Sequence, residues 1–138
     1  MMMAAFQYMN VPYKWGGSNY LGFDCSGYVL QVLHDVGLTL PDMTAHGLYQ
    51  YCLKNGNRTS MECDSLLFFG SEKKITHVAI SIGEWDGEAY MFEAGGAGRN
   101  SLDMSKEDLA KRDARVRMKP VSNRSDLVTS IYLPYKKE

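Results

Sequence analysis

The first half of the chain carries apolar positions at helical spacing. From Asp24 to about Val36, valine and leucine recur three and four residues apart, and Gly37 follows where a helix is expected to stop. Residues from about Thr44 to Lys54 predict a second, weaker helix that ends at Asn55-Gly56. The apolar opening from Met1 to Phe6 predicts a short first helix. The N-terminal part of the chain is therefore predicted to be helical.

Beyond Ser65 the apolar positions alternate with a period of two, which is typical of β-strands. The predicted strands are Leu66 to Phe69, Thr76 to Ile82, Glu88 to Ala94, Arg115 to Val121 and Leu127 to Leu133. Asp86-Gly87 lies between the second and third strands and strongly favours a tight hairpin, so these two strands are predicted to be antiparallel neighbours. Helices followed by a run of strands indicate an α+β domain with its helices packed on an antiparallel sheet.

Length and composition limit the classes of protein to consider. A chain of 138 residues with 45% apolar content suits one hydrophobic core, so residues 1–138 are treated as a single domain. The formal net charge of -1 gives no electrostatic basis for binding nucleic acid. No stretch approaches the roughly 20 apolar residues that cross a bilayer. The opening residues lack the features of a signal peptide, which leaves a cytoplasmic, a virion-associated or an otherwise exported protein as open alternatives.

Three cysteines are the first candidates for chemistry. Cys25, Cys52 and Cys63 are odd in number and widely spaced, which does not suit a disulfide framework or a zinc site, so at least one thiol should be free. Asp24 is a good N-cap, which makes Cys25 the first helical residue, facing inward toward the sheet. Unpaired N–H groups at a helix start favour a thiolate and can hold an oxyanion. The alternative is a buried, inert cysteine.

His77 begins the second predicted strand and is the candidate base. One face of this strand carries Val78, Ile80 and Ile82, and the other carries His77, Ala79 and Ser81. The small residues of the second face predict room for a packed helix, and the Cys25 helix in that place would bring the thiol to the imidazole. A lone histidine is more often structural. His34 and His46 are weaker candidates, because His34 lies off the apolar stripe and His46 has no obvious orienting partner.

Glu93 is the candidate for a third group that holds the other nitrogen of the imidazole. A hairpin register centred on Asp86 sets Ala79 opposite Glu93, which makes Glu93 a diagonal neighbour of His77 on the same face. A slip of one residue would turn the carboxylate away. The alternative is an ordinary solvated carboxylate on a strand.

Three motifs occur together in the order and spacing of a known family. They are Val11-Pro12-Tyr13-Lys14-Trp15-Gly16-Gly17, Phe23-Asp24-Cys25-Ser26-Gly27-Tyr28-Val29 and His77-Val78-Ala79-Ile80-Ser81-Ile82-Gly83. With two further landmarks, Leu40-Pro41 and Asp64 to Phe69, they resemble the NlpC/P60 family of cell-wall cysteine peptidases from about Met9 to Ala94. The resemblance implies a papain-like NlpC/P60 fold, with N-terminal helices on an antiparallel sheet of five to six strands. It also implies hydrolysis of amide bonds in peptidoglycan stem peptides, commonly next to D-glutamate.

The resemblance carries roles onto particular residues. It implies Cys25, His77 and Glu93 as the catalytic residues, and it implies Tyr13, Asp24 and Ser26 as residues near a substrate's free amine. A carboxylate and two hydroxyls suit an ammonium group, although Asp24 has the alternative of acting only as the N-cap. The third catalytic position of the family is usually His, Asn or Gln, so Glu93 departs from the pattern. A carboxylate stabilises imidazolium more strongly than an amide does, which predicts a changed pH profile.

The predicted function is therefore a thiol peptidase with a Cys-His-Glu triad and a thioester intermediate, which requires neither a metal nor another cofactor. One alternative is a thiol acyltransferase or amidase of the same fold. The other is a phage tail-associated component for assembly or lysis. The expected partners are peptidoglycan stem peptides, with phage-tail or cell-wall assembly proteins as further candidates, and neither nucleic acid binding nor a membrane span is expected.

Overall fold

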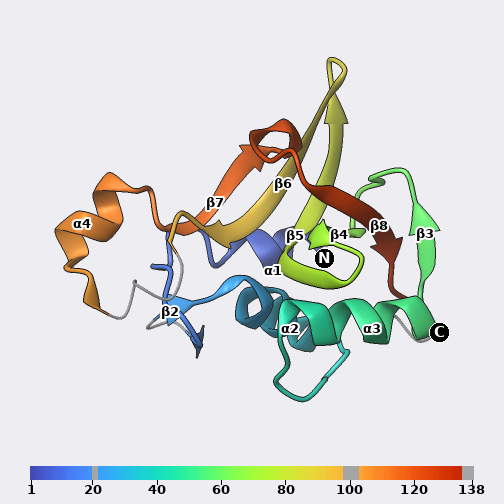
Figure 1. Cartoon of the computed structure of the whole chain (residues 1–138), viewed down its shortest axis with the longest axis horizontal. Coiled ribbons are helices and arrows are strands. Elements are labelled where there is room, and N and C mark those ends of the chain that lie inside the picture. The colour runs from blue at the N-terminus through green and yellow to red at the C-terminus, as the bar shows by residue number, and fades with distance from the viewer. Residues whose placement is uncertain (20–21, 98–102, 135–138) are drawn as a thin grey trace.

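The computed structural model describes residues 1–19, 22–97 and 103–134. In chain order its elements are α1 (Met2–Phe6), β1 (Ser18–Asn19), β2 (Gly22–Phe23), α2 (Cys25–Asp35), α3 (Ala45–Asn55), β3 (Asn57–Thr59), β4 (Leu66–Ser71), β5 (Lys74–Trp85), β6 (Glu88–Gly95), α4 (Lys106–Lys111), β7 (Arg115–Pro120), the 3-10 helix η2 (Val121–Asn123) and β8 (Leu127–Tyr132). Helices α2 and α3 lie side by side below the sheet, and α4 projects away from it (Figure 1). Within the described residues, no helix is both long enough and apolar enough to cross a membrane.

Helix α2 begins and ends where the sequence predicts. Asp24 has extended backbone geometry, and its side chain accepts the N–H of Gly27 as an N-cap does. At the other end Gly37 has a φ of 107°, and its N–H donates to the carbonyl of His34 at 3.1 Å. Glycine tolerates this left-handed conformation, so it ends the helix without steric cost.

Helix α3 also begins at a capping side chain and ends at a glycine. Thr44 is its N-cap, with a side chain that accepts the N–H of Gly47, and Gly56 is its C-cap. The predicted second helix is therefore confirmed. The predicted short helix at the N-terminus is also present, as α1.

The main sheet has six strands in the order β3-β8-β4-β5-β6-β7, and every neighbouring pair is antiparallel. All five predicted strands are present in it, which confirms the α+β class and the antiparallel sheet of five to six strands. The sequence analysis missed β3, the two-stranded β1–β2 ribbon and α4. These elements contain two to six residues, which is too short for an apolar period to mark them.

The β5–β6 hairpin is closed by the Asp86-Gly87 turn. Both turn residues have positive φ, at 51° and 79°, as a type I′ turn requires, and Trp85 pairs with Glu88. Between Ser81 and Gly83 the register shifts by one residue, so that Ile80 pairs with Phe92. Because of this bulge, the strands have the predicted register around Glu93. Without it, the pairing that starts at the turn would place Glu93 one residue away from that register, on the opposite face.

The two faces of the sheet are covered differently, and one expectation about them is wrong. Helices α2 and α3 pack on the face of Val78, Ile80 and Ile82 rather than on the face of His77. The reason is physical: branched aliphatic side chains bury more apolar surface against a helix than Ala79 and Ser81 can. The second face has its own smaller cluster, which consists of Leu67, Phe69, Ala79, Met91 and Val121.

Candidate active site

Cys25 is the first residue of α2, and the preceding residue fixes its position. Oδ1 of Asp24 accepts the N–H of Gly27 at 2.7 Å, while Oδ2 accepts the N–H of Gly16 at 3.1 Å. One carboxylate therefore ties the start of the helix to the loop beside it. The sulfur of Cys25 lies 4.0 Å from the carbonyl oxygen of Thr76 on β5, so the thiol faces the sheet as predicted.

The start of α2 also packs directly against the loop that contains Gly16 and Gly17. A Cβ atom added to Gly27 would lie 2.1 Å from the carbonyl oxygen of Gly17 and 2.8 Å from Oδ1 of Asp24. Only glycine fits at this close approach of two backbones. The loop and the helix start are thereby held as one unit around the thiol.

A β-bulge in the pairing of β4 with β5 places His77 near the thiol of Cys25. The pairing of β4 with β5 shifts between Phe69 and Gly70, which leaves Thr76 as an extra residue. Such a bulge bends a strand locally, and here it lies at the end of β5 beside the N-terminus of α2. His77 is thus on the face away from the helices and still lies in the same cavity as Cys25, close enough for the thiol to influence its pKa.

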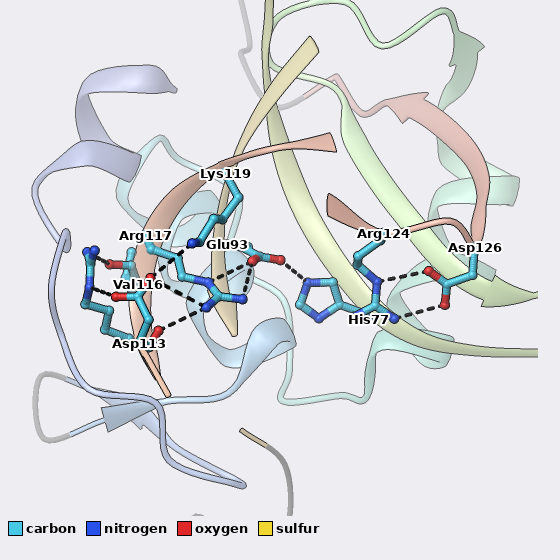
Figure 2. Close-up of polar contacts among 9 residues, drawn as sticks. His77, Glu93, Asp113, Val116, Arg117, Lys119, Arg124 and Asp126 are labelled. Carbon is cyan, nitrogen blue, oxygen red and sulfur yellow. Dashed lines mark hydrogen bonds and ion pairs between the residues drawn. The ribbon is translucent and has the colours of Figure 1, made fainter. Parts of the chain in front are cut away.

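His77 and Glu93 form the shortest described contact of the site. His77 Nε2 lies 2.6 Å from Oε1 of Glu93, and both residues are buried, with exposed fractions of 7% and 1% (Figure 2). Donation from Nε2 leaves Nδ1 as the nitrogen for the thiol. The predicted diagonal contact across the hairpin is therefore present.

The charges of this pair reinforce each other. Burial alone would lower the pKa of His77, but its interactions with the neighbouring Cys25 and Glu93 outweigh burial and raise the pKa to about 9. Burial alone would raise the pKa of Glu93, yet the hydrogen bond and charge of His77, together with Arg117, hold it below its ordinary value. The geometry thus favours an imidazolium beside an ionised carboxylate.

Arg117 is a site residue that the sequence analysis missed. Its Nε donates to Oε2 of Glu93 at 2.9 Å from the neighbouring strand β7, directly opposite in the register (Figure 2). The sequence offers only an arginine on a predicted strand. Because a long connection precedes β7, the register that sets Arg117 against Glu93 could not be read from spacing.

All six predicted site residues line one cavity of about 570 Å³. They are Tyr13, Asp24, Cys25, Ser26, His77 and Glu93. Burial and the negative charges of Cys25 and Asp24 raise the pKa of the Tyr13 hydroxyl above its ordinary range. The pKa of Asp24 is also raised, because burial outweighs its backbone hydrogen bonds. Tyr13 is therefore a neutral donor beside a partly desolvated carboxylate.

Of the remaining histidines and cysteines, His46 shares this cavity, and His34, Cys52 and Cys63 are not part of its lining. His46 lines the same cavity and has a partner that the sequence did not suggest, since the N–H of Ile75 donates to its Nδ1 at 3.0 Å. His34 is exposed and bonds Thr39 at 2.8 Å. All three cysteines are free thiols, as predicted for at least one of them. Cys52 is buried, and burial raises its pKa to about 12. Among the described residues no group of side chains has the arrangement of a metal site.

Part of the chain is similar in sequence to several curated proteins. Protein P54 of Enterococcus faecium is 36% identical over 88 residues, which cover 57% of this chain and 15% of that protein. The gamma-D-glutamyl-L-lysine dipeptidyl-peptidase of Bacillus subtilis (strain 168) is 31% identical over 83 residues, which cover 55% of this chain and 26% of that protein. The chain thus spans about a quarter or less of the length of these curated relatives.

Solved structures agree on the fold. The crystal structure of the NlpC/p60 domain of the peptidoglycan hydrolase SagA matches with a TM-score of 0.67 and 24% identity, over 96% of this chain and 95% of that one. The profile described as the NlpC/P60 family matches residues 10–118, which include every candidate site residue and Arg117. The chain belongs to the NlpC/P60 family.

Proposed function

We propose that this chain is a cysteine-type hydrolase that cleaves amide bonds of peptidoglycan stem peptides, with Cys25 as nucleophile, His77 as acid and base, and Glu93 as the third catalytic group. One observation carries the proposal: Cys25, His77 and Glu93 meet in one cavity, with His77 Nε2 at 2.6 Å from the Glu93 carboxylate. Family membership supports the same reaction class.

In the proposed acylation step, the Cys25 thiolate attacks the carbonyl carbon of the scissile amide. The N–H groups of Cys25 and Ser26 belong to the first turn of α2, where helix geometry provides no intrahelical acceptors, so they are suited to hold the oxyanion. The C–N bond then breaks as the His77 imidazolium gives its proton to the leaving amine. A thioester on Cys25 and a neutral imidazole remain.

In the proposed deacylation step, His77 takes a proton from water as the water attacks the thioester. The C–S bond breaks, the carboxylic acid product leaves, and the thiolate–imidazolium pair is restored. Glu93 stabilises the imidazolium whenever it forms and holds the ring by Nε2. Every proton of this cycle is carried by His77.

The proposed substrate follows from the cavity and from the names of relatives. Asp24, Tyr13 and Ser26 border the nucleophile with one carboxylate and two hydroxyls, which suit the free amine of a short peptide. The Bacillus subtilis relative is named for cleavage between a gamma-D-glutamyl and an L-lysyl residue. A bond next to D-glutamate is therefore the proposed site of cleavage.

The test is digestion of purified stem peptides, with the products identified by mass spectrometry. We expect a new pair of fragments from the parent protein and none from Cys25→Ala, because no other group in the cavity is placed to form the thioester. Cys63→Ala is the matched control, since that cysteine is exposed and lies outside the cavity lining. A folded parent protein that cleaves no stem peptide, or a Cys25→Ala variant that keeps full activity, would refute the proposal.

A further inference from the structure

A buried guanidinium group lies next to the proposed triad, and the mechanism above does not use it. Arg117 places Nε and Nη2 each 2.9 Å from Oε2 of Glu93, and its side chain is only 11% exposed. The other carboxylate oxygen of Glu93 is the one that contacts His77. Glu93 is therefore shared between an imidazole and a guanidinium, one on each oxygen (Figure 2).

Burial makes a counter-charge necessary for Glu93. The Glu93 side chain is 2% exposed, and an isolated carboxylate at such a depth takes up a proton rather than remain charged. Arg117 holds its charge at all accessible pH values, so it keeps the carboxylate ionised whether His77 is protonated or neutral.

Arg117 is itself fixed at the other end of its guanidinium. Nη1 donates to the carbonyl oxygen of Asp113 at 3.1 Å and lies 3.7 Å from its carboxylate. Asp113 also contacts Arg115 at 2.6 Å and Lys119 at 3.2 Å. Because the guanidinium is bonded to Glu93 on one side and to Asp113 on the other, Arg117 fixes the orientation of the Glu93 carboxylate and also keeps it ionised.

A structural role is the alternative, because Glu93 and Arg117 are direct cross-strand partners and such pairs stabilise sheets. The contact with His77 separates the two roles. An arginine that only joined β6 to β7 would not alter the titration of the imidazole. One that polarises the shared carboxylate would.

We propose that Arg117 is a positioning residue, which keeps Glu93 ionised and aimed at His77 and thereby sets the pH range over which His77 exchanges its proton. The proposal rests on the proposed function for its catalytic consequence. Its effect on the titration of His77 does not require any substrate.

Several charged groups face His77 from the elements around it, and the expected shifts follow from them. In the described part of the chain these are Cys25 from α2, Glu93 from β6, Arg117 behind Glu93 from β7, and the ion pair of Arg124 with Asp126 before β8. Of these, only Arg117 acts through the triad carboxylate. Without Arg117, a neutral His77 would leave the buried Glu93 carboxylate without the guanidinium as counter-charge, so the imidazolium gives up its proton only at higher pH and its pKa rises. Loss of the negative charge of Glu93 lowers the pKa of His77.

The direct test follows the ring resonances of His77 by NMR as pH is varied. We expect Arg117→Gln to raise the pKa of His77 by about one unit, as for removal of a nearby charge, and Arg117→Lys to leave it within about 0.3 units. Arg115→Gln is the matched control, because it removes a cation from the same strand that also binds Asp113 but does not contact Glu93. An unchanged titration in folded Arg117→Gln would overturn the proposal.

A second pair of variants covers the case in which Arg117→Gln does not fold. Glu93→Gln should lower the pKa of His77, and the double variant Glu93→Gln with Arg117→Gln, which buries no uncompensated charge, should lie close to Glu93→Gln. A double variant that departs from Glu93→Gln by a full unit would show that Arg117 acts on His77 without Glu93, contrary to the proposal.

Activity then gives an independent readout. With a stem peptide that the parent protein cleaves, the alkaline limb of the kcat/KM profile of Arg117→Gln should move to higher pH together with the titration of His77. Arg117→Lys should instead lose activity about tenfold at every pH, because its single ammonium cannot orient the carboxylate. A uniform loss in Arg117→Gln without movement of the limb would indicate a structural role. Failure of the parent protein to cleave any stem peptide would refute the proposed function and leave the NMR result to decide the role of Arg117.

Discussion

Single residues at this site carry more than one task, and Asp24 is the clearest case. Its two oxygens hold the N–H groups of Gly27 and Gly16, which explains why the sequence pattern predicts an N-cap. The same carboxylate lines the cavity, and burial raises its pKa. A carboxylate has about four lone-pair positions, so acceptor capacity remains for a substrate amine.

Asp24→Asn keeps the helix cap and removes the charge, because the one amide oxygen of asparagine can still accept the N–H of Gly27. The contact with the N–H of Gly16 is lost with the charge, and the acetylated peptide reports that loss separately. We expect the parent protein to cleave a stem peptide with a free N-terminal amine faster than its N-acetylated form. A charged hydrogen bond contributes about 1.5 to 3 kcal/mol, so Asp24→Asn should lower kcat/KM for the free amine roughly tenfold to a hundredfold and change it little for the acetylated peptide.

Asp42→Asn is the control for Asp24, because Asp42 lies close enough to influence its charge but is not part of the cavity lining. This control should leave the preference for a free amine unchanged. Equal losses of Asp24→Asn on both peptides would assign Asp24 to the helix cap alone.

The same scale shows what the sequence could and could not predict about the site. Cys25 could be predicted because its signal is local: a capping residue and the helix that follows. The nearness of Glu93 to His77 could be predicted because one turn joins their strands, although the bulge that sets the face of Glu93 could not. Arg117 could not, because nothing local sets the register of β7 against β6.

At the scale of elements, the site depends on interruptions of regular structure that sequence patterns do not reveal. The bulge between Ser81 and Gly83 puts Glu93 on the face of His77, and the bulge at Thr76 brings the end of β5 to the start of α2. Each bulge adds one residue to one strand and leaves the apolar period almost unchanged. The apolar period therefore sufficed to predict the helices and strands. The sequence analysis also placed Cys25 near His77, but on the wrong assumption that the Cys25 helix packs on the His77 face of the sheet.

The joint between α2 and its loop offers a test at this scale. Gly27 and Gly47 occupy the same third position of α2 and α3, and each donates its N–H to the capping side chain. Gly27→Ala should destabilise the fold by several kcal/mol and reduce activity, because the added Cβ would lie 2.1 Å from a backbone oxygen.

Gly47→Ala is the matched control. Its Cβ would lie 3.3 Å from Cβ of Met43, a tight contact that a shift of a few tenths of an ångström relieves, and alanine favours a helix by up to about 1 kcal/mol over glycine. We expect stability close to that of the parent or slightly higher in urea unfolding. Equal effects of the two substitutions would show that the contact of α2 with the loop is not tight.

At the scale of the whole molecule, helices cover one face of the sheet, and the proposed catalytic groups lie on the other face beside its smaller apolar cluster. Helices α2 and α3 bury the face of Val78 and Ile80, and the opposite face carries a line of charged groups from Asp113 through Arg117 and Glu93 to His77 (Figure 2). The N-terminus of α2, beside the start of β5, is near both. The fold class was predictable from the order of helices and strands. Which face of the sheet the helices cover depended on which side chains bury more apolar surface.

The buried imidazole also couples this line of charges to global stability. The pKa of His77 is raised from 6.5 to about 9, so its protonated form stabilises the folded chain fully below pH 6.5, and this contribution is lost as pH rises through about 9. We expect the free energy of unfolding, measured by urea denaturation at pH 6, 7.5 and 9, to fall on the order of 2 kcal/mol across that range. The lowered pKa of Glu93 does not contribute there, because its stabilisation is lost only in acid. His77→Gln should remove most of this slope while His34→Gln, at an exposed histidine, should keep it. A slope that survives in His77→Gln would mean that other groups titrate in this window and that the imidazolium is not what links the site to the stability of the fold.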